Sequence, residues 1–231
     1  MNTSPSRRAD ALHALAAALL CLGIGISAHA LPANAAPAPT PEAAALPTDS
    51  VYRLPVALTD QAGRSFRLDE RRARPLLVSM FYTSCQFVCP MLIESIRDAQ
   101  RQLAPAEREQ VDVLLVSFDP EHDTVAVLKR TADQRGVDPA HWTLARTDAA
   151  TARKLASVLG IQYRALGNGD FNHTTAILLL DREGRIVARS SKLGSAEPAF
   201  VHRVRALARA AQNENEAPAT TAPRRPPKTA G

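Results

Sequence analysis

Two cysteines and one histidine are the residues of this chain best suited to chemistry. Cys85 and Cys89 are separated by three residues in the segment FYTSCQFVCPM, and His173 precedes an apolar run much later in the chain. Paired thiolates bind soft metal ions or form and break a disulfide, and an imidazole nitrogen can complete such a metal site. The three residues therefore predict either a soft-metal site or a redox-active dithiol.

The C-x3-C spacing separates these uses only in part. A structural disulfide at this spacing would close a very short loop and constrain the unfolded chain little. Zinc normally recruits four ligands, whereas Cu(I) accepts two or three soft ones. If the site holds a metal, we expect copper, with Cu(I) favoured over Cu(II). Thiol–disulfide exchange and an inert bridge remain as alternatives.

Other donor residues lack evident partners in the sequence. The remaining histidines with ligand potential stand in polar or helical contexts, where histidine is usually a surface or capping group: His122, His141 and His202. Asp119 ends a predicted strand, where it either supports a ligand or caps an Asp-Pro turn. Met91 is a soft donor that we interpret as core packing, as we do Trp142.

Alternating apolar patterns predict the elements that position these residues. We expect strands at 56–58, 65–68, 76–82, 111–118, 142–145, 174–180 and 185–188, and helices at 90–103, 124–135, 148–159 and 197–211. The first two strands should form an N-terminal β-hairpin, and Asp123 should be the N-cap of the second helix. Strand–helix–strand units that end in a hairpin and a helix predict an α/β fold, a central mixed sheet with helices on both faces.

The cysteine loop follows the strand at 76–82, and Cys89 with Pro90 opens the next helix. A thiolate at this position is stabilised by the helix dipole and by free backbone N–H groups. We therefore expect the pKa of Cys89 to lie below that of an unperturbed cysteine, about 8.5.

Composition divides the chain into a folded part and two ends. We expect a signal peptide at 1–30, a Pro/Ala-rich linker at 31–49, one domain at 50–211 and a disordered tail at 212–231. The first segment could also remain as a membrane anchor. Export to the periplasm, either free or anchored to the inner membrane, leaves Cys85 and Cys89 as the cysteines of the mature chain, because Cys21 departs with the signal.

Charge argues against a nucleic-acid partner. The net charge is +5, the basic residues are scattered, and aromatic residues make up 4% of the chain. A nucleic-acid surface usually combines clustered basic side chains with aromatic ones. We expect no nucleic-acid binding.

Three segments resemble the Sco/SenC family, thioredoxin-fold copper proteins that help to assemble the CuA centre of cytochrome c oxidase. They are FYTSCQFVCPM, VSFDPEHDTVAVLKRTADQRGVDPAHW, and a histidine before TTAILLLD followed by a D-x-x-G-R turn. The resemblance covers about residues 50–210. It implies a thioredoxin-like sandwich in which Cys85, Cys89 and His173 bind copper.

The same resemblance implies a metallochaperone with a redox-active dithiol rather than a turnover enzyme. Its partners would be the copper-bearing subunit of cytochrome c oxidase and thiol-redox proteins. This chain departs from the family pattern at Gln86, where a proline is common, and at Asn172, where an aspartate often precedes the histidine. The alternative function is a thiol–disulfide oxidoreductase that reduces partner cysteines without carrying copper.

Overall fold

The computed structural model describes residues 46–216. The predicted signal peptide, most of the predicted linker and residues 217–231 lie outside this part of the chain. Within residues 46–216, no helix is long and apolar enough to cross a membrane.

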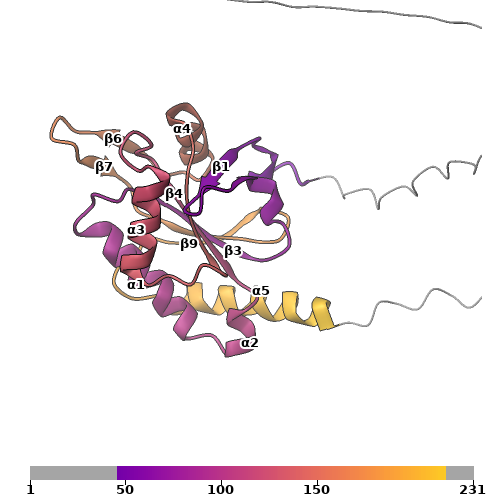
Figure 1. The fold of residues 1–231 in the computed structure, drawn as a ribbon. Helices are drawn as coiled ribbons and strands as arrows, with labels where there is room; N and C mark the ends of the chain where they lie inside the picture. The colour runs from indigo at the N-terminus through magenta and orange to yellow at the C-terminus, as the bar shows by residue number, and fades with distance from the viewer. Residues whose placement is uncertain (1–45, 217–231) are drawn as a thin grey trace, which may run out of the picture. The chain divides into compact units, whose positions relative to one another are not determined.

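A seven-stranded mixed sheet forms the centre of the domain, in the order β2-β1-β5-β4-β3-β8-β9 (Figure 1). Its strands are β1 (Ala57–Asp60), β2 (Ser65–Arg67), β3 (Leu76–Phe81), β4 (Asp112–Ser117), β5 (Trp142–Arg146), β8 (Ile177–Leu180) and β9 (Ile186–Ser190). Strands β3, β4 and β5 run parallel, and both flanks are antiparallel. The predicted α/β class, mixed sheet and N-terminal hairpin are confirmed.

The central strands are apolar because helices and loops cover them on both faces. Every residue of β3 and β8 is buried, as are all but the first of β4. Unbroken apolar runs of this kind are typical of buried parallel strands, whereas half-exposed strands alternate. The sequence pattern therefore places β3, whose end leads to the cysteines, at the middle of the core.

Within residues 46–216, five α-helices accompany the sheet: α1 (Val88–Arg101), α2 (Pro105–Arg108), α3 (Val125–Arg135), α4 (Ala149–Val158) and α5 (Pro198–Glu216). Two short 3-10 helices, η1 (Val51–Arg53) and η2 (Leu68–Arg71), flank the first hairpin. Right-handed crossovers through α1 and α3 advance in one direction across the sheet, so both helices lie on the same face (Figure 1). Arg97 of α1 accordingly donates a hydrogen bond to the carbonyl of Arg135 at the end of α3.

A separate two-stranded ribbon, β6 (Tyr163–Ala165) and β7 (Phe171–His173), projects from the domain (Figure 1). Its antiparallel register pairs Tyr163 with His173. The sequence pattern does not predict this hairpin, because each strand has three residues and shows too little alternation to detect. The turn includes Gly169, whose φ of 84° suits glycine.

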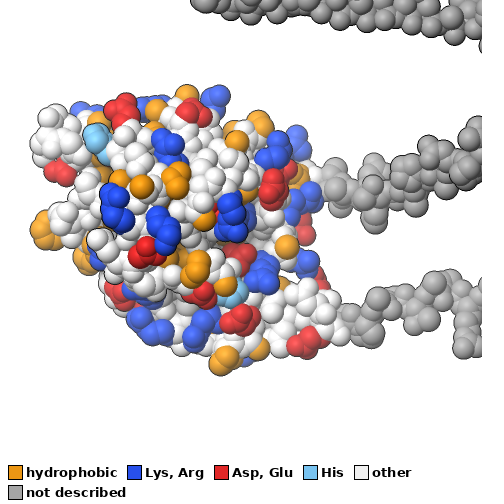
Figure 2. Space-filling model, in the orientation of Figure 1, with side chains coloured by type: hydrophobic (Ala, Val, Ile, Leu, Met, Phe, Trp, Pro, Cys, Tyr) orange, Lys and Arg blue, Asp and Glu red, His pale blue; other side chains and the backbone are white. Residues whose placement is uncertain are grey.

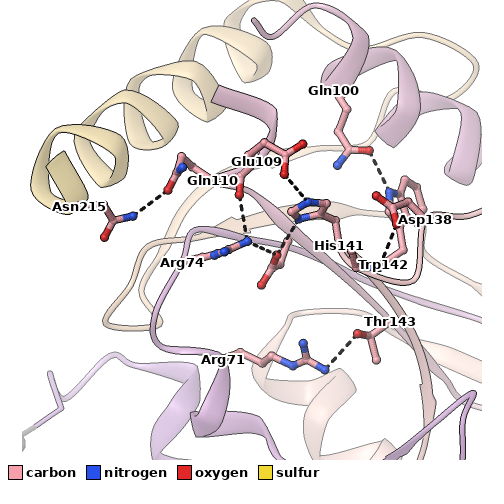
Figure 3. A network of polar contacts seen from close by, with 12 residues as sticks. Arg71, Arg74, Gln100, Glu109, Gln110, Asp138, His141, Trp142, Thr143 and Asn215 are labelled. Carbon is pink, nitrogen blue, oxygen red and sulfur yellow. Dashed lines mark hydrogen bonds and ion pairs between the residues drawn. The ribbon is translucent and has the colours of Figure 1, made fainter. Parts of the chain in front are cut away.

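Most element boundaries differ from the prediction by one to three residues, and three of the differences affect the site or the extent of the domain. Helix α1 begins at Val88, which makes Pro90 its third residue rather than its first. Thr124, not Asp123, is the N-cap of α3, because the Asp123 side chain is used elsewhere. Helix α5 runs to Glu216, past the predicted end of the domain, and Asn215 donates a 2.9 Å hydrogen bond to Gln110 (Figure 3).

Candidate thiol and metal site

The site lies where two neighbouring parallel strands end. The cysteine loop follows β3, and the segment from Phe118 to Asp123 follows β4. Parallel neighbours present their carboxyl ends at the same edge of a sheet, where loops gather functional side chains. The fold thereby brings the two segments together, as the strand prediction implied.

Both thiols are free and buried at the beginning of α1. Cys85 is 6% exposed and Cys89 is 4% exposed. The backbone N–H of Cys89 donates to the Cys85 sulfur over 3.3 Å. Because α1 begins at Val88, Cys85 precedes the helix and meets its unpaired N–H groups, while Cys89 sits within the first turn and packs in the core.

The two thiols consequently differ in acidity. Burial acts to raise the pKa of Cys85, but hydrogen bonds from the Cys89 backbone and thiol, and from the N–H groups of Phe87 and Val88, hold it below the ordinary value. Burial raises the pKa of Cys89 far above its ordinary value, and the charge on Cys85 raises it further. The expectation that Cys89 has a lowered pKa is wrong. The helix start stabilises the thiolate of the preceding cysteine instead.

This order of acidity predicts the order of alkylation. In a Cys89→Ser variant, the remaining thiol should react with iodoacetamide with a midpoint below about pH 8.5, because its backbone donors are kept. In Cys85→Ser, the remaining thiol should react slowly up to strongly alkaline pH. The check is the alkylation rate measured against pH by mass spectrometry. Equal midpoints in the two variants would contradict the assignment.

His173 lies at the end of β7, half-buried against aromatic rings. Its ring centre is 5.9 Å from that of Tyr82 and 5.2 Å from that of Phe118. Phe171 and Tyr163 complete this aromatic cluster. These supporting rings were not among the residues predicted from the sequence. Tyr82 and Phe118 immediately follow β3 and β4, a position that could have indicated them.

A cleft of about 370 Å³ connects His173 with Cys85. Phe87 and Leu166 also line it, whereas Cys89 does not. Among residues 46–216, no three His, Cys, Asp or Glu side chains are grouped closely enough to hold a metal ion. The structure therefore brings both sulfurs together and brings His173 to the same cleft, but the three side chains do not converge on one point.

Asp123 fastens the cysteine loop to the end of β4. It is buried, and it accepts hydrogen bonds from the Thr83 backbone over 3.1 Å, from the Thr83 hydroxyl and from the Ser117 hydroxyl over 2.5 Å. Burial raises the pKa of Asp123 despite these bonds. The carboxyl group thus positions a backbone segment two residues before Cys85.

Replacing this anchor should destabilise the domain. Asp123→Ala leaves two hydroxyls and one N–H without an acceptor, so we expect the free energy of unfolding to fall by about 2–4 kcal/mol. Urea denaturation measures the loss. The control is Asp133→Ala, which removes an exposed carboxylate paired with Lys129 and should change the stability by less than about 0.5 kcal/mol. Equal effects of the two substitutions would refute the anchoring role.

Asp119 and His122 form a pair beside the site rather than within it. Asp119 is buried, and His122 Nδ1 lies 2.9 Å from its carboxylate. The hydrogen bond and charge of Asp119 raise the pKa of His122. Both residues line a neighbouring cleft of about 300 Å³ with Arg153, and neither lines the Cys85 cleft. Of the two roles considered for Asp119, the turn is observed: its carbonyl accepts the backbone N–H of Asp123 over 2.9 Å.

His141 and His202 do not line the Cys85 cleft. His141 precedes β5, at the opposite ends of the parallel strands, and its ring nitrogens face Asp112 at 3.3 Å and Glu109 at 2.9 Å (Figure 3). Since both nitrogens are engaged by carboxylates, neither is free to bind a metal. His202 is exposed on α5.

Two expectations about packing have opposite outcomes. Trp142 is buried, and its indole N–H donates to Gln100 over 3.0 Å, so its assignment to the core is confirmed (Figure 3). Met91 is 45% exposed, so its assignment to the core is wrong. It stands in the first turn of α1, and its side chain lies near Gly194 and remains partly exposed.

Fold and site together define a class. A central parallel strand that leads into a buried C-x3-C pair, with an imidazole in the same cleft, is the arrangement of an α/β dithiol protein with soft-metal donors.

Comparison with known proteins narrows the class. The SCO1/SenC family model matches residues 46–209. The chain belongs to this family. It is 23% identical over 138 residues to the SCO1 protein homolog of Bacillus subtilis strain 168, which covers 58% of this chain and 70% of the relative.

Solved structures of Sco proteins are similar to this domain. ScoI of Bradyrhizobium japonicum, with copper bound, superposes with a TM-score of 0.54 at 26% identity, over 66% of this chain and 97% of that one. BsSco, described as having a disulfide switch and as a member of the Sco family of cytochrome c oxidase assembly proteins, superposes with a TM-score of 0.56 at 20% identity, over 69% and 92% of the two chains. The predicted thioredoxin-like sandwich is confirmed.

Proposed function

We propose that this protein is a copper metallochaperone that carries Cu(I) on Cys85, Cys89 and His173 and helps to deliver it to the CuA centre of cytochrome c oxidase. The observation that carries the proposal is the common cleft of Cys85 and His173, with the second sulfur directly behind. Copper bound to ScoI and oxidase assembly by the family of BsSco support it.

The donor chemistry fits copper. Two sulfurs and one imidazole are the soft and borderline ligands that select Cu(I), and zinc would lack a fourth protein ligand. The apolar surroundings of the thiols would keep water from the ion. Cys85 would bind first, because its lowered pKa gives it a larger thiolate fraction than Cys89, whose pKa is raised. The proton of Cys89, held strongly in the free protein, would be released as the metal binds.

The same acidity order supports thiol–disulfide exchange as a second activity. Cys85 thiolate would attack a partner disulfide and release one partner thiolate, which takes up a proton. Cys89 would then lose its proton and attack Cys85, forming the Cys85–Cys89 disulfide and releasing the partner as a dithiol. Two electrons pass to the partner. Reduced target cysteines are needed before copper can be received, so the two activities would act in sequence.

Location would follow from the N-terminal segment. We propose that the protein is exported and acts in the periplasm, free or anchored to the inner membrane. Cysteines tend to form disulfides in this oxidising compartment, so a partner there needs a protein that keeps its cysteines reduced.

Metal competition tests the copper assignment. The reduced full chain should bind one Cu(I) per molecule, and a tenfold excess of Zn(II) should not displace it, since zinc prefers four ligands. Elemental analysis after gel filtration under nitrogen gives the occupancy of each metal. Comparable zinc and copper occupancy would count decisively against a copper chaperone.

A further inference from the structure

Exposed apolar side chains are concentrated around the Cys85 cleft. Among residues 46–216, the large hydrophobic side chains that remain exposed are Phe87, Met91, Val158, Leu166 and Ile186. Phe87 and Leu166 line the cleft, and Met91 follows Phe87 by one turn of α1; we refer to these three as the apolar rim. Isolated apolar residues on a surface need no explanation, but a group beside a reactive thiol marks a contact surface.

The apolar rim stands on two elements that face each other across the cleft. Phe87 precedes α1, and Met91 lies one turn later, its N–H bonded to the Phe87 carbonyl over 3.4 Å. Residues four apart share one side of a helix. Leu166 follows β6 in the turn of the β6–β7 hairpin, and both Phe87 and Leu166 line the cleft. Figure 1 shows the hairpin and the beginning of α1 on the same side of the domain.

Phe87 is the most exposed member, at 80%. It lies in the loop between the two cysteines, two residues after Cys85, and lines the same cleft as the Cys85 sulfur. Transfer of a phenylalanine side chain out of water is strongly favourable, and buried aromatic residues dominate protein interfaces. A partner that covers Phe87 therefore gains affinity at the place where sulfur chemistry occurs.

The charges around the cleft indicate what kind of partner fits. The segment from Cys85 to Met91 contains no charged residue. Asp170 is the acidic residue that lines the Cys85 cleft, whereas the neighbouring cleft also has Asp119, Glu121 and Arg153. Elsewhere, on the face drawn in Figure 2, basic and acidic side chains are interspersed. The surface nearest the thiol thus selects by apolar contact rather than by charge.

Access to the sulfur requires passage over the apolar rim. Cys85 is 6% exposed and opens into the cleft, while Cys89 does not line it. A small reagent can enter the cleft alone. A cysteine of a partner protein can reach Cys85 only together with the residues next to it in the partner's chain. Those residues then contact Phe87 and Leu166.

We propose that the apolar rim is the docking surface for a protein partner whose cysteine pair is flanked by apolar side chains. This inference rests on the proposed function, since it identifies the partner class of the same site. The reaction that reports docking is exchange: Cys85 thiolate attacks the partner disulfide, one partner sulfur leaves and is protonated, and Cys89 then closes the Cys85–Cys89 disulfide as the second partner sulfur leaves. Two electrons pass from the protein to the partner.

Two synthetic disulfide peptides test the proposal. Each contains a C-x3-C disulfide, flanked in one by Leu and Phe and in the other by Ser and Gly, with equal net charge. The reduced full chain should reduce the apolar peptide about tenfold faster. Phe87→Ser should abolish that preference, and Phe87→Leu should restore most of it. Val158→Ser, which removes an exposed apolar side chain on α4, is the matched control and should keep the preference.

Other readouts separate the outcomes. Oxidised glutathione should react at the same rate with Val158→Ser and with the unmodified chain, because it enters the cleft alone. For Phe87→Ser the readout is the ratio of the two peptide rates, since a change in the reactivity of Cys85 itself affects both peptides equally. Failure of the unmodified chain to bind Cu(I) or to reduce any disulfide would defeat the proposed function. Normal copper binding and exchange with equal rates for both peptides would overturn docking alone. Binding to phosphatidylcholine vesicles that is lost in Phe87→Ser, without peptide preference, would assign the apolar rim to a lipid surface and overturn the proposal.

Discussion

Cys85→Ser and Cys89→Ser are each expected to weaken Cu(I) binding on the order of a thousandfold. A protein metal site of four ligands is worth about 10–16 kcal/mol, so loss of one thiolate among three donors removes several kcal/mol. Each variant also loses the ability to form the intramolecular disulfide. Competition with a chromogenic Cu(I) chelator measures the affinity, and a thiol titration after mild oxidation measures the disulfide.

The two variants should differ in one respect. Cys89→Ser keeps Cys85, the thiol with the lowered pKa, and should accumulate a mixed disulfide with a partner. No second thiol is present to attack that mixed disulfide and release the partner. Cys85→Ser should form none at neutral pH, since burial keeps Cys89 protonated. Ser84→Ala, an exposed neighbour in the same loop, is the control and should behave like the unmodified chain. Full copper affinity in either cysteine variant would exclude a two-sulfur site.

His173→Ala is expected to weaken Cu(I) binding by about 100-fold and to leave thiol–disulfide exchange within about twofold, because a thiolate that attacks a disulfide needs no third ligand. The imidazole ring also packs against Tyr82 and Phe118, so its removal could loosen the hairpin. His173→Phe separates the two effects. It keeps an aromatic ring in this position and removes the nitrogen, and it should lose copper affinity to the same extent.

Oxidase assembly decides between the two functions. Cells that carry His173→Ala or His173→Phe should lose the CuA signal of cytochrome c oxidase nearly as fully as cells that carry Cys89→Ser. The adjacent exposed substitution Asn172→Ala should have no effect. Near-normal assembly in the His173 variants, together with loss in Cys89→Ser, would make ligation by His173 dispensable and would favour the oxidoreductase.

Much of the architecture follows from local pattern. The apolar runs of β3, β4 and β8, the hairpin turn before Arg64, and the helical spacing after Pro90 each depend on residues close together in the chain. Buried parallel strands must be continuously apolar, so the runs mark both the strands and their central place. The short β6–β7 hairpin could not be found in this way, because it is held by contacts of Tyr163 and Phe171 with Phe118.

The sequence by itself determined which residues are the candidates for the chemistry. Cys85, Cys89 and a histidine before a strand are selected by type and spacing, because the donor atom that a residue can offer is a property of its side chain alone. It also determined that the two cysteines stand at the beginning of a helix.

Only the tertiary structure decided how these groups differ in reactivity. Helix α1 begins two residues earlier than predicted, so its free N–H groups face Cys85 while Cys89 is buried. This reverses the expected order of the two pKa values. The exposure of Phe87 and Met91 and the burial of Asp123 also depend on neighbours remote in sequence. Acidity and accessibility are determined by solvent exclusion and hydrogen-bond donors, which the packed chain supplies from several elements at once.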